Sequence, residues 1–239
     1  MLPTLEAPEL VFGLCSPIGT DNVQVVDLIK KELLTFYYKP HRFKVTDLMK
    51  AIKLKNYDLV ETPIEKRYDA YIRYANRLRE VSENPNVLAM LCCAAIRGHR
   101  RKTAKTADKY LPSTAYIFDQ FKRREEVEAL RQVYGKLFIS VSIYSDRETR
   151  LQRLSQKISA DHSGARVTAE ELNAASALIT RDENEEGVAH GQRLRDAFPL
   201  ADLFINIDDF GSAQKVISRF FQSLFGSNRI SPTRDEYGT

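Results

Sequence analysis

Short apolar runs alternate with helical patterns along this chain, and the alternation restricts the fold more than any other feature. The first run, Leu10–Cys15, is apolar on both faces, as expected for a strand buried inside a parallel sheet. Residues 21–36 follow as a predicted helix with one apolar stripe. Further strands are predicted at 42–46 (an edge strand), 114–119, 137–144 and 202–207. Strands joined through helices form a parallel sheet covered by helices on both faces, with a ligand at the strands' carboxyl ends.

The helices are predicted mainly from capping signals. Residues 62–98 contain two helices, the first opened by a capping box with proline, Thr62-Pro-Ile-Glu65, and the second starting near Asn84. The pair forms a helical insertion, about residues 62–110, between the second and third strands. Tyrosines 68, 71 and 74 recur at helical spacing, and we expect them to pack in the core. Other helices are predicted at 123–134, ended by Gly135, and at 212–225. Two more, at 145–157 and from 168, are each opened by a capping box.

Composition limits the class of protein. The 239 residues are 43% hydrophobic and 28% charged, as in globular domains, and no apolar stretch has membrane-spanning length. The N-terminus lacks the pattern of a signal peptide. Cys92 and Cys93 lie in an apolar run and, like Cys15, are expected to be free thiols, which fits a reducing, cytoplasmic location. We expect one domain over residues 1–226, followed by a linker at 227–239.

The segment after the first strand has the strand–loop–helix layout of a P-loop, in a nucleotide-kinase-like fold. It reads Gly13-Leu-Cys-Ser-Pro-Ile-Gly-Thr-Asp-Asn22, whereas a working phosphate loop reads G-x-x-x-x-G-K-[ST]. Aligned on a small-molecule kinase loop, the two glycines fall at Ser16 and Asp21, the lysine at Asn22, and the magnesium-binding hydroxyl at Val23. Charge neutralisation drives phosphoryl transfer, so losing the lysine and the metal ligand should remove most catalysis.

A loop without these catalytic side chains can still bind an anion. Gly19, Thr20 and the helix N-terminus still offer backbone N–H groups and a positive dipole end. The competing interpretation is that Ser16, Thr20 and Asp21 only cap the helix. Asp119, at the end of the third strand, stands where a Walker B acid would hold Mg²⁺ through water, but a helix cap explains it equally well.

Two charged segments are further candidates for binding phosphate. Residues 181–198 contain Arg181, His190, Arg193 and Arg195, which would clamp phosphates, or else form surface salt bridges with neighbouring acids. The basic run 97–105 accounts for much of the net charge of +4 and suits phosphate or nucleic acid, but a solvated loop after a helix is the simpler interpretation.

Three segments together give a family resemblance. Gly13–Asp21, Asp119–Gly135 and Gly191–Ile205 resemble the N-terminal P-loop domain of the bacterial anti-phage dCTP/dCMP deaminases, and Ile230–Gly238 resembles the entry to their deaminase domain. The resemblance spans nearly the whole chain and implies a regulatory role in antiviral defence. It also implies that the Gly-Thr-Asp ending of the loop, without lysine, is typical of the family.

The zinc chemistry of that family has no counterpart in this sequence. Deamination needs H-x-E and P-C-x-x-C motifs, and none of the four histidines is followed by glutamate two positions later. Zinc is therefore expected only in an absent deaminase domain, and Mg²⁺ is not expected. The leading hypothesis is a nucleotide-binding regulatory module that is not itself catalytic. The alternatives are an active nucleoside or nucleotide kinase, and a ligand-free scaffold that binds a deaminase half, in cis or in trans, or an RNA regulator. A second copy of the chain is a further candidate partner.

Overall fold

The computed structural model describes residues 7–164, 166–184, 191 and 194–226. Its centre is a five-stranded sheet of order β2-β3-β1-β4-β5, in which every pairing is parallel. The strands are β1 (Leu10–Cys15), β2 (Lys39–Lys44), β3 (Thr114–Phe121), β4 (Phe138–Tyr144) and β5 (Leu203–Asn206). The central strand β1 is fully buried and leads through a loop into the first helix, the layout of a P-loop in a nucleotide-kinase-like fold.

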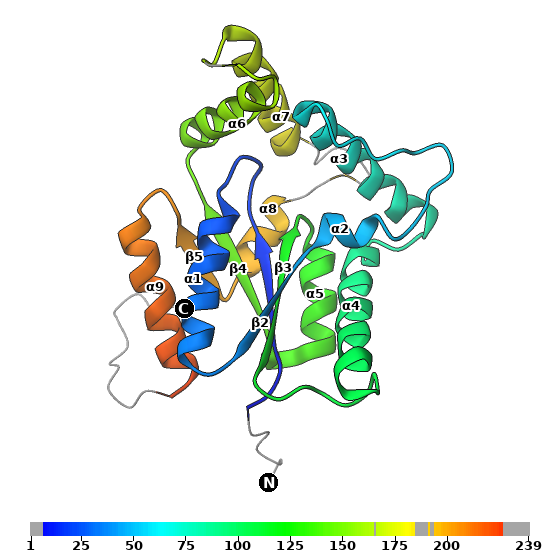
Figure 1. The fold of residues 1–239 in the computed structure, drawn as a ribbon, viewed down its shortest axis with the longest axis vertical. Coiled ribbons are helices and arrows are strands. Elements are labelled where there is room, and N and C mark those ends of the chain that lie inside the picture. Colours follow the sequence, from blue (N-terminus) through cyan, green and yellow to red (C-terminus); the bar gives the residue numbers. More distant parts are fainter. Residues whose placement is uncertain (1–6, 165, 185–190, 192–193, 227–239) are drawn as a thin grey trace.

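Helices cover both faces of this sheet (Figure 1). α1 (Asn22–Thr35) and α9 (Phe210–Leu224) cover one face, where Phe12 stacks on Phe221. The other face carries α2 (Val45–Met49), α4 (Val87–Ala104), α5 (Arg124–Tyr134) and α8 (Leu194–Ala197). The predicted α/β class, with a parallel sheet between two helical layers, is confirmed.

Three helices lie beyond the carboxyl ends of the strands, at the top of Figure 1. They are α3 (Ile64–Val81), α6 (Arg147–Asp161) and α7 (Ala169–Asn184). α6 and α7 form a small apolar core of their own, which includes Ile18 from the loop after β1 and is joined by Ile64 and Tyr68 from α3. We call α3, α6 and α7 the helical cap. Its contact with Ile18 connects it directly to the loop predicted to hold phosphate.

Several predicted boundaries differ from the structure. The second strand lies at the sheet edge as expected, but it spans 39–44, and the short helix α2 follows it. α4 continues to Ala104, so most of the basic run 97–105 is helix rather than loop. Arginine, lysine and alanine favour helix, and Lys105 ends it in the left-handed conformation.

Two of the predicted capping boxes are also wrong in detail. The Thr62 box makes no side-chain cap, and α3 begins at Ile64, whose N–H donates to Asp161 Oδ2 (2.8 Å) at the end of α6. The N-cap of α6 is Asp146, which accepts from Thr149 N, rather than Ser145. At α3, a contact from another helix takes the place of the local cap. At α6, the carboxylate of Asp146 is a stronger acceptor than the hydroxyl of Ser145.

Candidate functional site

Close packing determines the path of the loop between β1 and α1. A Cβ on Gly13 would lie 2.8 Å from the ring of Phe138, so the strand needs glycine there to pack against its neighbour. Gly19 has a φ of +85°, and a Cβ there would lie 2.8 Å from the carbonyl oxygen of Arg150 on α6. The Arg150 guanidinium also donates to the carbonyl oxygen of Ile18 (3.3 Å). Gly13 and Gly19 are thus required for the shape of the loop, whatever it binds.

The start of α1 is capped by the chain itself. Asp21 is the N-cap, and its Oδ1 accepts from Val23 N (3.2 Å) and Gln24 N (3.4 Å). The capping interpretation therefore holds for Asp21. It does not hold for Thr20, because its Oγ1 is buried without a hydrogen-bond partner among the described residues.

A chain of polar contacts connects the loop to β3 and β2. Ser16 Oγ donates to Asn22 Oδ1 (2.8 Å), and Asn22 Nδ2 donates to Asp119 Oδ1 (2.7 Å). The other oxygen of Asp119 pairs with Arg42 NH2 (2.5 Å). Gln120 Nε2 completes the chain by donating to Ser16 Oγ (2.5 Å). Ser16, Asn22 and Asp119 thus meet as predicted, but Asp119 caps no helix, and both of its oxygens are already bound.

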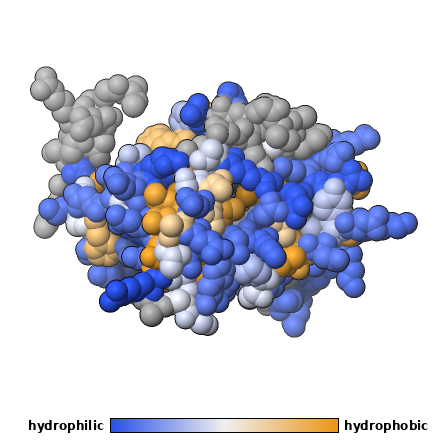
Figure 2. Space-filling model, turned by 90° about the horizontal axis from the view of Figure 1, so that it is seen from above, coloured by the Kyte–Doolittle hydropathy of each residue, from blue (hydrophilic) through white to orange (hydrophobic). Residues whose placement is uncertain are grey.

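A cavity of about 270 Å³ opens beside this loop at the carboxyl ends of β1, β2 and β3. Its walls come from the loop 17–23, from β2 and α2, from α3, and from the segment after β3. Figure 2 views the molecule from above, from the side of the helical cap, where hydrophobic patches interrupt a mostly hydrophilic surface. The polar and charged side chains that line it are Thr20, Asp21, Asn22, Arg42, Lys44, Thr46, Arg67, Arg79, Asp119, Gln120, Lys122, Glu126, Lys157 and Asp182.

Asp182, near the end of α7, bridges the helical cap and the sheet. Its Oδ2 accepts from Ile18 N (2.8 Å), a backbone donor of the loop. Both of its oxygens also pair with Lys122 Nζ (2.8 and 3.0 Å). Asp182 is buried, so this carboxylate already neutralises the lysine that lies next to the cavity.

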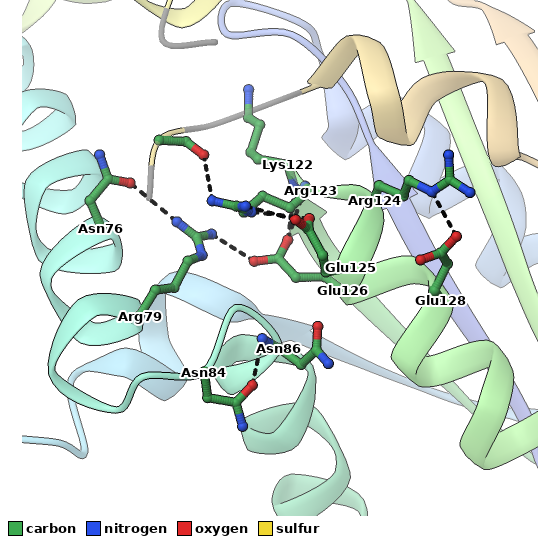
Figure 3. Close-up of polar contacts among 11 residues, drawn as sticks. Asn76, Arg79, Asn84, Asn86, Lys122, Arg123, Arg124, Glu125, Glu126 and Glu128 are labelled. Atoms are coloured by element: carbon green, nitrogen blue, oxygen red, sulfur yellow. Dashed lines mark hydrogen bonds and ion pairs between the residues drawn. The ribbon is translucent and has the colours of Figure 1, made fainter. Parts of the chain in front are cut away.

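A buried ion pair lies at the α3–α5 side of the cavity (Figure 3). Arg79 NH2 pairs with Glu126 Oε1 (2.6 Å), and the two side chains are 2% and 0% exposed. Glu126 Oε2 accepts from the backbone N–H groups of Lys122 (3.1 Å) and Arg123 (3.2 Å) at the start of α5. The Arg123 side chain donates to the carbonyl oxygen of Gly191 (3.0 Å). Every acceptor oxygen of Glu126 is thus occupied, so the pair forms a fixed polar wall.

The rim of the cavity contains a second, more exposed cluster. Tyr71 Oη donates to Glu61 Oε1 (2.6 Å), and Lys50 and Arg67 pair with the same carboxylate. The hydrogen bond from Tyr71, aided by Lys50, lowers the pKa of Glu61 to about 2. Burial raises the pKa of Tyr71 and of neighbouring Tyr68, so both phenols keep their protons at neutral pH. The predicted core role of the tyrosines is confirmed for Tyr71 and Tyr74, while Tyr68 and Tyr71 also line the cavity.

The two described arginines of the predicted phosphate clamp, Arg181 and Arg195, do not line the cavity. Arg181 pairs with Asp69 of α3, and exposed Arg195 lies on α8, so neither lines the cavity. His190 and Arg193 fall outside the described residues. Asp182 turns toward Ile18 and Lys122 instead of joining a surface network with these arginines.

One group in the cap has ligand types suited to a metal. Glu65, Asp161 and His162 place one ligand atom each within 4.8 Å of one another, at the junction of α3 and α6. His162 Nε2 already lies 3.3 Å from Glu65 Oε1, and Asp161 already accepts from Ile64 N. These contacts explain the grouping as a helix-to-helix link.

Sequence analysis missed most of the polar side chains that line the cavity, among them Arg42, Gln120, Lys122 and Asp182. Each reaches the loop through contacts between residues that are 60 to 164 positions apart in the sequence, so local patterns do not reveal them. The charged run after β3 was the one available signal for Lys122.

Comparisons with known proteins do not assign this chain to a family. No family model matches the chain, and no curated protein matches it. Among solved structures, it is similar to an uncharacterized protein from Eubacterium ventriosum, with 16% identity, a TM-score of 0.43, and coverage of 90% of this chain and 98% of the other. It is also similar to a gluconokinase from Sinorhizobium meliloti, with 10% identity, a TM-score of 0.39, and coverage of 92% and 97%. In the described residues, no helix combines the length and apolar character needed to cross a membrane.

Proposed function

We propose that this chain is a nucleotide-binding regulatory domain that holds a phosphorylated nucleotide beside the loop 16–22 without transferring phosphate. It would act together with a zinc-dependent deaminase of deoxycytidine nucleotides, in cis or in trans, in defence against phage. The deaminase part of the proposal rests on the resemblance of three segments to that family. The binding part rests on the cavity and on the loop beside it.

The proposal rests mainly on the side chain of Asn22 and on its hydrogen bonds. A kinase needs a cation where Asn22 lies, yet this neutral side chain is held between Ser16 and Asp119. The next residue, Val23, is half exposed and offers no oxygen to a metal. The cavity thus retains room and hydrogen-bonding groups for a ligand, while the lysine and the hydroxyl required for phosphoryl transfer are missing.

Calorimetry and a phosphotransfer assay on the same protein preparation test this proposal. Titration with nucleoside mono- and triphosphates should give saturable heat for at least one of them. Incubation with γ-labelled ATP and a mixture of nucleosides and nucleoside monophosphates should give no labelled product and no ADP above a protein-free control. Transfer of label to an acceptor, lost in Gly19→Ala, would show that the domain is a kinase.

A second candidate function follows from the end of α4. Arg101, Lys102, Lys105 and Lys109 are all exposed there, and none has an ion-pair partner among the described residues. Such a cluster attracts polyanions, and the occupant that fits it is an RNA regulator. Binding of a fluorescent single-stranded RNA that weakens steeply with salt, and that is lost in Arg101→Gln/Lys105→Gln, would support this role. Salt-independent binding, or none, would exclude it.

A further inference from the structure

Two buried polar atoms at the cavity lack partners, and both suit the same kind of ligand atom. They are Thr20 Oγ1 and Arg42 Nε, neither of which has a hydrogen-bond partner among the described residues. Thr20 is only 9% exposed, and both residues line the cavity. Folded proteins pair the large majority of buried side-chain polar atoms, so two unpaired ones at one cavity indicate an acceptor that comes from a ligand. An oxyanion is the acceptor that suits a hydroxyl and a guanidinium N–H at once.

The charges along the cavity indicate how much negative charge that ligand carries. Its cations are Arg42, Lys44, Arg67, Arg79, Lys122 and Lys157, and its carboxylates are Asp21, Asp119, Glu126 and Asp182. Six cations and four carboxylates line the cavity, and Lys50 and Glu61 at the rim add one charge of each sign, so the surplus stays at two positive charges. A phosphate monoester carries a charge of about −1.5 to −2 at neutral pH, so one such group balances this surplus. A triphosphate would need further neutralisation.

Among the described residues, Asp119 stands where a kinase would hold the metal ion that supplies such neutralisation. Both oxygens of Asp119 are occupied, one by Asn22 and one by Arg42. Arg42 thus supplies beside the loop the positive charge that Mg²⁺ supplies in a kinase. A ligand here is bound by the protein's own cations.

Away from the loop, the cavity is mainly apolar and aromatic. Met49, Ile72, Ala75 and Leu88 line it from three helices, together with the rings of Tyr68 and Tyr71. Flat heteroaromatic groups bind well to such walls. The volume of about 270 Å³ is also small beside the roughly 300–1,000 Å³ typical of ligand pockets, which favours a compact ligand.

We infer that the cavity binds a nucleoside monophosphate without a divalent cation, with its phosphate at Thr20 and Arg42 and its base against the apolar wall. This inference deepens the proposed function and rests on it, because it identifies the ligand class of the same site. The exposed Lys157 and Lys44 would contribute long-range attraction to the phosphate.

Calorimetry with separate metal conditions tests the inference. The full chain is titrated with dAMP, dCMP, dGMP and dTMP in EDTA and again in MgCl₂, and then with the four triphosphates in MgCl₂. At least one monophosphate should bind with the same Kd, within about twofold, in both conditions. Thr20→Val keeps the shape of the side chain but removes its hydroxyl, and it should weaken that binding by about tenfold, as expected for losing a hydrogen bond to a charged group. Lys136→Gln, an exposed change just before β4 and away from the cavity lining, is the control and should bind like the wild type.

The possible results separate the inference from the proposed function. Triphosphates that bind more tightly than every monophosphate, and only with Mg²⁺, would overturn the inference and leave nucleotide binding intact. Unchanged monophosphate binding in a folded Thr20→Val protein would overturn the assigned position of the phosphate. No binding of any nucleotide would remove the proposed function itself.

Discussion

Gly19 is the residue on which the shape of the loop depends most directly. Its φ of +85° is unfavourable for any side chain, and a Cβ would meet the Arg150 carbonyl oxygen at 2.8 Å. We expect Gly19→Ala to lower the free energy of unfolding by about 1–3 kcal/mol, measured by urea denaturation.

Gly98 provides the matched control for this substitution. It lies inside α4, and an added Cβ would meet no atom within 4 Å. Gly98→Ala should raise the free energy of unfolding by about 0.5–1 kcal/mol, because alanine is the better helix former. If both variants shift stability in the same direction, backbone conformation is not what requires glycine at position 19.

The three cysteines should differ in reactivity because they differ in burial. Burial raises the pKa of Cys15 to about 12, and it also raises the pKa of Cys92 and of the half-buried Cys93. At pH 8, Ellman's reagent should therefore react slowly with native protein, first at Cys93, and should detect three thiols after unfolding in urea. Cys93→Ser should remove the early phase. A native Cys15 that reacts as fast as the unfolded thiol would contradict this burial.

At the residue scale, sequence reasoning found the loop but not the partners that fix its side chains. The apolar run 10–15 and the helical pattern after it place Ser16, Thr20 and Asn22 correctly, because these signals are local. The contact of Arg42 with Asp119 depends instead on the register of β2 against β3, in which the backbone of Lys44 lies opposite that of Asp119. Nothing in a single sequence determines that register across about 70 intervening residues.

At the scale of elements, a fully buried ion pair joins α3 of the insertion to α5. Arg79 on α3 and Glu126 on α5 are both buried, so removing either one leaves a charge without its partner. Arg79→Met and Glu126→Gln should each lower the free energy of unfolding by about 3–5 kcal/mol. Chemical denaturation of the two single variants and the double variant forms the cycle that measures their coupling.

The double variant decides whether the pair or its surroundings cause that loss. If the pair matters as a pair, Arg79→Met/Glu126→Gln should cost clearly less than the sum of the single changes. Arg77→Met, at an exposed ion pair on the same helix, is the control and should change stability by less than about 1 kcal/mol. Strict additivity would show that Arg79 and Glu126 act independently.

Element types were predicted better than their ends, for a physical reason. Each long periodic segment became the expected helix or strand, because burial of one face determines its type. The ends depended on partners elsewhere: Asp161 caps α3 from another helix, and α4 runs two turns beyond its apolar stripe. Basic residues 97–105 looked like a loop because they break the apolar pattern, yet they are good helix formers.

At the scale of the whole molecule, the sheet and the helical cap meet at the cavity. The sheet has one apolar core on each face, whereas α6 and α7 share a small third core with Ile18. A small core stabilises its helices less than a large one, so we expect the cap to open at a lower free energy than the whole domain unfolds. Asp182 opposes that opening, because it ties α7 to Ile18 and Lys122.

Asp182→Asn should therefore loosen the cap while the sheet stays intact. The asparagine oxygen can still accept from Ile18 N, but the Lys122 ammonium, whose side chain is only 12% exposed, loses its counter-charge, which costs several kcal/mol. Hydrogen–deuterium exchange should speed up by at least about tenfold in 147–161 and 169–182, and should stay unchanged in β1 and β4. Asp27→Asn, at an exposed pair on α1, should change neither region. Equal acceleration in cap and sheet would mean that the two unfold as one unit and that Asp182 is not the tie between them.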